Sequence, residues 1–188
     1  MARSRIKSVR DKPRSPPSGT GVASPERQAS VTDDRDSSYR PGIGIILLNA
    51  RGDIFIGRRA DVQGEAWQMP QGGIDERESP RDAALRELKE EIGTNNAEII
   101  AESGRWLYYD VPEEFARRAW KGRWKGQRQK WFVMLFKGAD SEIDLEGNHP
   151  EFSAWRWTTV NELMALAVSF KRQLYLDVIG EFPTIFRD

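Results

Sequence analysis

Three glutamates within five residues could hold a metal ion. Glu87, Glu90 and Glu91 are spaced i, i+3 and i+4, which places their carboxylates on one face of a helix. Like charges at this spacing repel each other by a few tenths of a kcal/mol per pair. A hard divalent cation with oxygen ligands would remove this repulsion, so the pattern favours Mg²⁺ or Mn²⁺. The alternative is an acidic helix face that is only solvated, which is the usual role of such clusters.

The chain around the glutamates predicts a helix with two defined ends. Ser79 is a good N-cap, Pro80 suits the first helical position, and Gly93 can end the helix. Apolar residues at helical spacing predict that the opposite side packs on a sheet. These residues are Ala84, Leu85, Leu88 and Ile92. Before the helix, Gly72 and Gly73 lie in a loop whose backbone can approach a ligand closely.

Apolar and alternating segments predict the strands of that sheet. We expect five or six strands, including residues 42–48, 53–58, 98–110, 129–137 and 153–158. Further helices are predicted at residues 159–167 and 170–182. Strands and helices interleave, so the prediction is an α/β layered domain over residues 39–188.

Residues 1–38 have a different composition from the rest of the chain. They are rich in Ser, Pro, Arg and Asp and contain almost no large apolar side chains, so we expect a disordered extension. The first 22 residues carry six basic residues and one acidic residue, Asp11. An auxiliary RNA-binding arm and a merely solvated tail both remain open.

Composition excludes several classes of function. The chain has 188 residues, no cysteine and one histidine, His149, which argues against disulfides, thiol nucleophiles and zinc catalysis. No apolar run approaches the roughly 20 residues that cross a bilayer, so we expect a cytoplasmic protein without a membrane partner. Lys plus Arg equals Asp plus Glu at 29 each, so binding to a polyanion must depend on local charge.

One such local concentration of charge lies at residues 115–137. This tract has eight basic residues and no acidic residue, and it contains Trp120, Trp124 and Trp131. Cations interleaved with aromatic rings are typical of single-stranded RNA binding. Trp131 lies in a predicted strand and is expected in the core, and Trp155 and Trp157 are expected to pack between layers.

The segment from residue 72 to residue 94 forms a long spaced motif. It reads Gly72-x5-Glu78-x7-Arg86-Glu87-Leu88-x-Glu90-Glu91-x-Gly93-Thr94. This series resembles the Nudix box, and only Thr94 departs from it, at a final apolar position. The resemblance implies a Nudix α/β/α sandwich with a mixed β-sheet and a catalytic loop-helix-loop. It also implies metal-dependent hydrolysis of nucleoside diphosphates that are linked to another group.

The resemblance assigns roles to the matching residues. Arg86 would orient a glutamate, Glu78 would tie the loop to the helix through Arg86, and Gly93 would be structural. Glu151, in a loop before a strand, is a further candidate for the metal site and for the general base. The implied metal ligands are the Gly72 carbonyl oxygen, Glu87, Glu90, Glu91 and Glu151.

Other segments resemble the bacterial RNA pyrophosphohydrolases and their dinucleoside polyphosphate hydrolase relatives. The similarity covers residues 39–182, with segments at 39–42, 57–59, 67–73, 126–132, 150–152 and 169–172. It implies that Phe170 stacks on a nucleobase. It also implies phosphate or base contacts by Arg40, Arg59, Gln127, Lys130 and Lys171.

The expected reaction is removal of pyrophosphate from the 5′-triphosphate end of RNA, which leaves a 5′-monophosphate and promotes RNA decay. Hydrolysis of dinucleoside polyphosphates such as diadenosine tetraphosphate needs the same metal centre, and only the basic tract favours RNA. A non-catalytic Nudix-like module that binds RNA or nucleotides is the alternative from another class. Such a module would have little reason to keep all three helix glutamates.

Overall fold

A computed structural model describes residues 37–62, 64–146 and 150–186 of the chain. Most of the predicted N-terminal extension, at residues 1–36, lies outside the described residues, as does His149. Within these ranges the strands form one eight-stranded mixed sheet. They are β1 (Tyr39–Leu48), β2 (Ile54–Arg59), β3 (Trp67–Gln68), β4 (Gln71–Gly73), β5 (Ala97–Glu102), β6 (Leu107–Asp110), β7 (Gly126–Phe136) and β8 (Phe152–Thr158).

A parallel pair of long strands forms the centre of the sheet. β1 and β7 run side by side from Tyr39 opposite Gly126 to Leu48 opposite Leu135. The other strand pairs are antiparallel. The short strand β4 pairs with the first half of β1, with Gly72 opposite Ile43. This pairing brings the predicted loop to the middle of the sheet.

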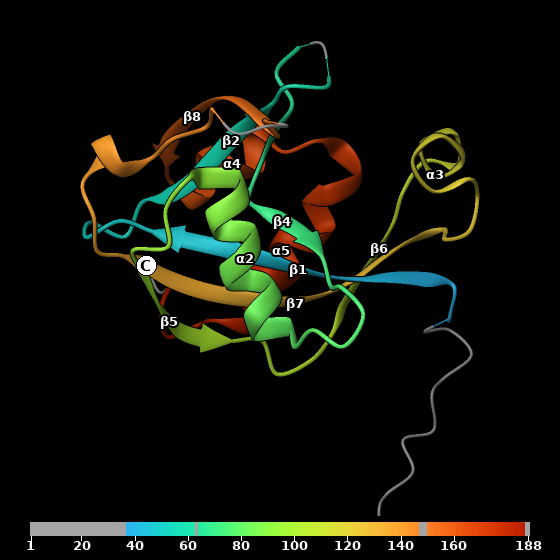
Figure 1. Cartoon of the computed structure of the whole chain (residues 1–188), viewed down its shortest axis with the longest axis horizontal. Coiled ribbons are helices and arrows are strands. Elements are labelled where there is room, and N and C mark those ends of the chain that lie inside the picture. The colour runs from blue at the N-terminus through green and yellow to red at the C-terminus, as the bar shows by residue number, and fades with distance from the viewer. Residues whose placement is uncertain (1–36, 63, 147–149, 187–188) are drawn as a thin grey trace, which may run out of the picture. The chain divides into compact units, whose positions relative to one another are not determined.

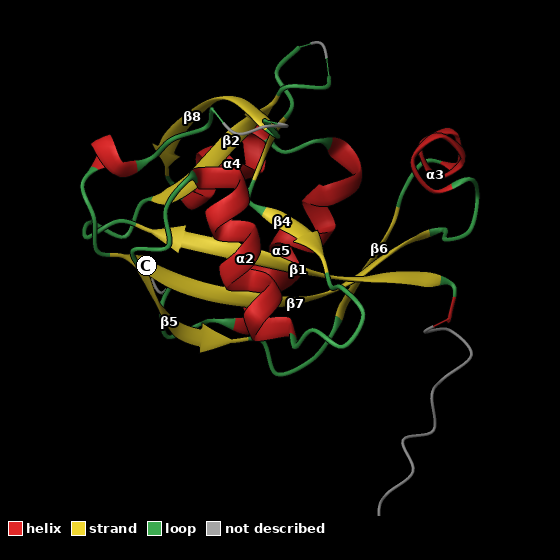
Figure 2. Cartoon of the chain, viewed as in Figure 1, coloured by secondary structure: helices red, strands yellow, loops and turns green. Residues whose placement is uncertain are grey.

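Helices cover both faces of the sheet. They are α2 (Pro80–Ile92), α3 (Glu113–Trp120), α4 (Val160–Leu166) and α5 (Arg172–Glu181), with the 3₁₀ turns η1 (Asp140–Glu142) and η2 (Ser169–Lys171). In Figure 1, α2 crosses in front of β1 and β7, and α5 lies behind them. Figure 2 shows α3 apart from the other helices, beside β6 and the start of β7.

The side chains of β1 alternate between two cores, although the strand is apolar along most of its length. Ile43, Ile45 and Leu47 pack with Ala84 and Leu88 of α2. Ile46 and Leu48 belong to the core that includes Leu163 of α4 and Leu174, Tyr175 and Val178 of α5. A strand buried on both faces needs apolar residues at every position, which explains the continuous run. The predicted α/β/α sandwich with a mixed sheet is confirmed.

Both predicted ends of the glutamate helix are confirmed. The Ser79 hydroxyl accepts a hydrogen bond from the Asp82 backbone N–H at 3.1 Å. Gly93 has φ of 79°, a left-handed conformation that costs glycine little, and its N–H donates to the Lys89 carbonyl at 3.1 Å. α2 is therefore fixed at each end by its own sequence.

Three predictions about the elements were wrong. Over the described residues the sheet has eight strands rather than five or six, because β3 and β4 are too short to show periodicity and because β5 and β6 fall within one predicted strand. The strand predicted over 98–110 is broken after Glu102, where the Ser103 hydroxyl accepts from the Trp131 N–H and donates to the Arg105 carbonyl. Helix α3 was missed because its N-cap, Pro112, provides no side-chain hydrogen bond.

The tryptophan predictions hold. Trp131 has no exposed surface and packs against Tyr175, with 5.9 Å between ring centroids. Trp155 and Trp157 lie on the same strand beside Phe55, at 5.6 Å and 5.9 Å between centroids, and pack against the core under α2. Over the described ranges, every helix is too short or too polar to cross a membrane.

A buried hydrogen bond connects α5 to the segment that leads into β4. The Tyr175 hydroxyl, fully buried, accepts from the Met69 backbone N–H at 3.1 Å. We expect Tyr175→Phe to lower the free energy of unfolding by about 1–3 kcal/mol, because the Met69 N–H would stay buried without a partner. Denaturant unfolding measures this change. Leu176→Ala, at an exposed position on the same helix, is the control and should shift stability by less than about 0.5 kcal/mol. Equal stabilities of the two variants would contradict the prediction.

Candidate active site

Arg86 on α2 joins the preceding loop to the helix carboxylates. Its Nε and Nη2 donate to the two carboxylate oxygens of Glu78 at 2.9 Å and 2.8 Å. Its Nη1 donates to Glu87 at 2.9 Å and to Glu90 at 3.1 Å, and Nη2 also donates to the Gly73 carbonyl at 2.9 Å. The Arg86 guanidinium lowers the pKa of Glu78 to about 2. Glu78 therefore stays ionised and holds Arg86 in place.

Glu87 lies against the backbone of β4. A Cβ atom at Gly72 would overlap the Glu87 carboxylate, so only glycine allows this approach. Burial raises the pKa of Glu87, and Arg86 opposes this rise. The Gly72 carbonyl oxygen lies over Gly42, where a Cβ would come within 2.7 Å of it. Two glycines thus bring backbone and carboxylate together.

Glu91 is the most deeply buried acidic side chain of the helix. It is 8% exposed and accepts a hydrogen bond from the Gln71 backbone N–H at 3.2 Å. Burial raises the pKa of Glu91 well above its ordinary value, and the nearby charges of Glu151 and Glu87 raise it further. Glu90, in contrast, is 58% exposed at its side chain and contacts Arg86.

This donor set fits a hard divalent cation. The charges of Glu151 and Glu87 both act on Glu91 and raise its pKa, and a cation among these oxygen donors would relieve the repulsion. Among the described residues, no three acidic or histidine side chains converge as a preformed metal site.

Lys171 links the glutamates to η2 through two glutamines. Its Nζ donates to the side-chain oxygens of Gln68 at 2.6 Å and Gln71 at 2.8 Å. The Gln68 amide in turn donates to Glu151 at 3.3 Å. Lys171 is 2% exposed, and burial lowers its pKa to about 7, with Arg59 as a second cause. A lysine that is only partly charged near neutral pH is therefore held in the interior close to Glu151 and Glu91.

Arg59 lies close to Lys171 and forms a salt bridge with an acidic residue. Its Nε and Nη2 donate to the two oxygens of Asp61 at 2.8 Å and 2.6 Å. Its guanidinium lies 6.0 Å from the centroid of the Phe115 ring. The charge of Arg59 also acts on Tyr109 and Lys171, which places it at the same site.

Phe170 is half-buried and belongs to an aromatic group at the edge of the site. Its ring stacks on Tyr109 at 6.3 Å between centroids with an interplanar angle of 17°. Phe115 lies 6.5 Å from Phe170. Burial raises the pKa of Tyr109 to about 12, and its hydroxyl donates to the Gln127 side chain at 3.0 Å.

The remaining predicted contact residues have different surroundings. Arg40 lies beside Gly73 and lowers the pKa of Glu87, so it belongs to the site. The Gln127 side-chain oxygen accepts a hydrogen bond from the Tyr109 hydroxyl and lies on the same side of Gly42 as the Gly72 carbonyl. Lys130 donates to the Ser103 carbonyl at 2.7 Å and pairs with Glu102 at 3.2 Å. The structure therefore does not bring Lys130 together with the carboxylates.

Sequence reasoning missed four residues of this site: Gln68, Gln71, Tyr109 and Asp61. The first two lie in the segment of residues 67–73, which was interpreted only as a backbone loop. Their signal was present, because polar side chains within a buried segment need partners. Asp61 lies in an apparent insertion, and its contact with Arg59 has no sequence signature.

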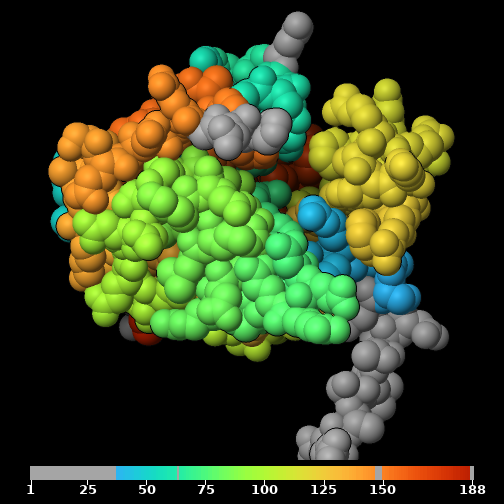
Figure 3. All heavy atoms as spheres, in the orientation of Figure 1, coloured from blue at the N-terminus to red at the C-terminus, as the bar shows by residue number. Residues whose placement is uncertain are grey.

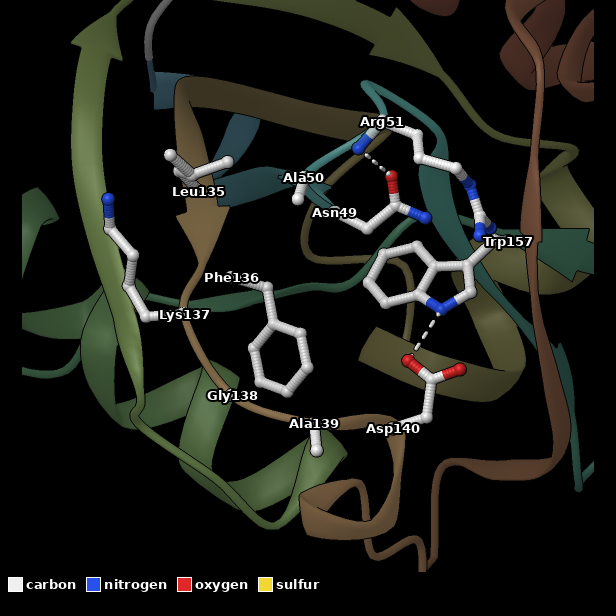
Figure 4. Close-up of a pocket in the computed structure, with 10 residues that line it drawn as sticks. All are labelled: Asn49, Ala50, Arg51, Leu135, Phe136, Lys137, Gly138, Ala139, Asp140 and Trp157. Carbon is white, nitrogen blue, oxygen red and sulfur yellow. Dashed lines mark hydrogen bonds between the residues drawn. The ribbon is translucent and has the colours of Figure 1, made fainter.

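A separate hollow of about 530 Å³ lies at the other end of β1. Figure 4 shows it between the β1–β2 turn, the end of β7 and Trp157, whose Nε1 donates to Asp140 at 3.0 Å. None of the predicted site residues lines it. The candidate active site is therefore the group of residues around Glu91, Lys171 and Arg86.

Comparisons with known proteins agree with this geometry. A model of the NUDIX domain matches residues 38–178. An RNA pyrophosphohydrolase from Rhodospirillum rubrum is 57% identical over 143 residues, which cover 76% of this chain and 86% of the relative. An RNA pyrophosphohydrolase from Wolbachia pipientis subsp. Culex pipiens is 49% identical over 153 residues, which cover 81% and 94%.

Solved structures show the same fold. An Escherichia coli dihydroneopterin triphosphate pyrophosphohydrolase superposes with a TM-score of 0.54 at 19% identity, covering 76% of this chain and 98% of that chain. A Caenorhabditis elegans Ap4A hydrolase in a binary complex has a TM-score of 0.56 at 19% identity, covering 75% and 96%.

Burial of Glu91 should make the metal-free protein sensitive to pH. The pKa of Glu91 is higher in the folded state than its ordinary value of 4.5, so ionisation above that pH disfavours the folded state. We expect Glu91→Gln to be more stable than the unchanged protein without divalent cations, by a margin that grows as the pH rises above the ordinary pKa of a glutamate, 4.5. Lys171 acts in the opposite direction above about pH 7, since its pKa is lowered, but it is present in both proteins. Thermal unfolding with a chelator at each pH measures the margin, and a margin that shrinks with pH would refute the assignment.

Divalent cations should make the unchanged protein more stable than the Glu91→Gln variant. At about 100 times its Kd, a bound ion stabilises the folded protein by about 2.7 kcal/mol. We expect this Mg²⁺-dependent gain in the unchanged protein and in Glu76→Gln, an exposed loop position, but much less in Glu91→Gln. An equal gain in all three proteins would place the cation elsewhere.

Proposed function

The chain belongs to the NUDIX family, and on that premise we propose that it is an RNA pyrophosphohydrolase. It removes pyrophosphate from the 5′-triphosphate end of RNA, leaves a 5′-monophosphate and so promotes RNA decay. The observation that carries this proposal is the 57% identity to an RNA pyrophosphohydrolase over most of both chains. The retained glutamates argue against a module that only binds RNA.

We place a divalent cation, Mg²⁺ or Mn²⁺, at the candidate active site. Glu87, Glu91 and Glu151 would hold it, with Glu90 and the Gly72 carbonyl oxygen as further ligands. When bound, such ions neutralise phosphate charge and lower the pKa of a water molecule that attacks phosphorus. No nucleophile from the protein is needed.

The side chains of the site have two further roles, which are to orient the metal ligands and to accept a proton from water. Arg86 orients Glu87 and Glu90 through the contacts at 2.9 Å and 3.1 Å. Glu91 lies close to Glu87 and Glu151, so it is a candidate for the carboxylate that accepts a proton from the attacking water. Glu90 and Glu151 are the other candidates for this base.

Cations around the glutamates would bind the triphosphate. Three basic side chains lie close to the carboxylates, because Arg40 interacts with Glu87, and Arg59 and Lys171 interact with Glu151. A phosphate beside Lys171 would favour its charged form and restore the pKa that burial lowers. Phe170 offers a flat ring to the first bases of the RNA.

The test is Mg²⁺-dependent release of pyrophosphate from 5′-triphosphorylated RNA, run beside hydrolysis of diadenosine tetraphosphate. We expect a higher kcat/KM for RNA. We expect Glu90→Gln and Glu91→Gln to keep the fold and to reduce turnover by roughly 100-fold or more, because each removes a charge that holds the metal. Glu76→Gln, in the exposed loop, should keep full activity.

Two outcomes would contradict parts of this proposal. Unchanged rates in both glutamine variants would refute the metal site. A higher kcat/KM for diadenosine tetraphosphate would keep the mechanism but assign the chain to clearance of dinucleoside polyphosphates.

A further inference from the structure

A series of aromatic rings extends from the candidate active site onto the segment around α3. Phe170, next to Lys171, lies 6.5 Å from Phe115. Phe115 lies 5.7 Å from Trp120, and Trp120 lies 6.2 Å from Trp124, measured between ring centroids. We call Phe115, Trp120 and Trp124 the aromatic track. It leads away from the site without a gap between neighbouring rings.

Cations accompany the aromatic track. The Arg118 guanidinium lies 5.9 Å from the centroid of Phe115, and that of Arg123 lies 4.4 Å from Trp124. Arg118, Lys121 and Arg123 all have exposed side chains. Such side chains can exchange a ring contact for a phosphate contact at little cost, because both partners are at the surface.

Packing alone does not explain these rings. The one buried residue of α3 is Ala116, whereas Phe115, Trp120 and Trp124 are each half-buried. Figure 3 shows the α3 segment, in yellow, beside the green and blue parts of the domain with a recess between them. A hollow of about 450 Å³ lies next to Phe170, between β6 and α5. Part of each of these three rings is therefore accessible, and so is the space beside Phe170.

We propose that the aromatic track binds single-stranded RNA immediately beyond the nucleotides that enter the active site. Bases stack on Trp120 and Trp124, and backbone phosphates contact Arg118, Lys121 and Arg123. This inference rests on the proposed function and extends it from the triphosphate end to the body of the RNA. The surface favours RNA over a protein partner, since residues 115–137 carry eight basic residues and no acidic residue, which suits a polyanion with stacking bases.

The experiment measures kcat/KM for 5′-triphosphorylated RNAs of increasing length and one unpaired sequence, beginning with the nucleoside triphosphate. We expect kcat/KM to rise with length and then level off. The Trp120→Ala/Trp124→Ala variant should lose at least about five-fold on the longest RNA, since stacking contributes roughly 1–3 kcal/mol per base. It should lose less than two-fold on the nucleoside triphosphate, which ends before the track.

A charge variant tests the same surface without removing a ring. We expect Lys121→Ala/Arg123→Ala to weaken metal-free binding of an unpaired RNA, measured by fluorescence anisotropy. It should also reduce the salt dependence of log K by about 0.7 per lost phosphate contact. The matched control for the Trp120→Ala/Trp124→Ala variant is Trp106→Ala. The Arg128 guanidinium lies 4.8 Å from the Trp106 ring, but Trp106 precedes β6, at the end of that strand away from α3.

Each outcome decides the inference. Equal losses on short and long RNAs would mean that the tryptophans only position the site, and an equal effect of Trp106→Ala would mean a general loss of stability. Either result overturns the proposal that the aromatic track binds RNA. If the unchanged protein does not hydrolyse triphosphorylated RNA at all, the proposed function fails. Binding of RNA to the track is then still decided by the anisotropy of the two variants.

Discussion

The candidate site depends on one guanidinium group that contacts three carboxylates. Arg86 holds Glu78 by two hydrogen bonds and reaches Glu87, Glu90 and the Gly73 carbonyl. Paired, two-point contacts of this kind fix geometry as well as charge. The loop before α2 and the helix itself are thus joined at the point where the carboxylates gather. Without this link, repulsion would spread the glutamates apart.

The same region depends on close approach of the backbone to side chains. Glycine at position 72 lets Glu87 reach β4, and glycine at position 42 leaves room for the Gly72 carbonyl. Lys171 then connects η2 to both glutamines of the β3–β4 segment. Arg86 and Lys171 therefore fix the segment of residues 67–73 from its two sides. A buried cation and a buried carboxylate, Glu91, sit on either side of it and moderate each other's charge.

Local sequence predicted the features that depend on local physics. The ends of α2 follow from Ser79 and Gly93, and the alternation in β1 follows from burial on both faces. The box residues were found by spacing within one loop and helix. The sequence could not reveal contacts between distant segments, such as Lys171 with Gln68 or Arg59 with Asp61, because they depend on how the sheet folds. Nor could it reveal that Lys130 pairs with Glu102 on the neighbouring strand.

The pairing of β1 with β7 has a consequence for the synthesis of the chain. β1 ends at Leu48, but its parallel partner β7 begins only at Gly126. The hydrogen-bond partners of Met69 and Gln68, which are Tyr175 and Lys171, are synthesised later still. A nascent chain on the ribosome therefore carries α2 long before the sheet beneath that helix can form completely. Contacts this distant in sequence slow folding and leave strand edges open meanwhile. Termination before η2 would remove Phe170 and Lys171, and termination before Tyr175 would leave the Met69 N–H without its partner, so the candidate site is complete only when nearly the whole chain has been translated.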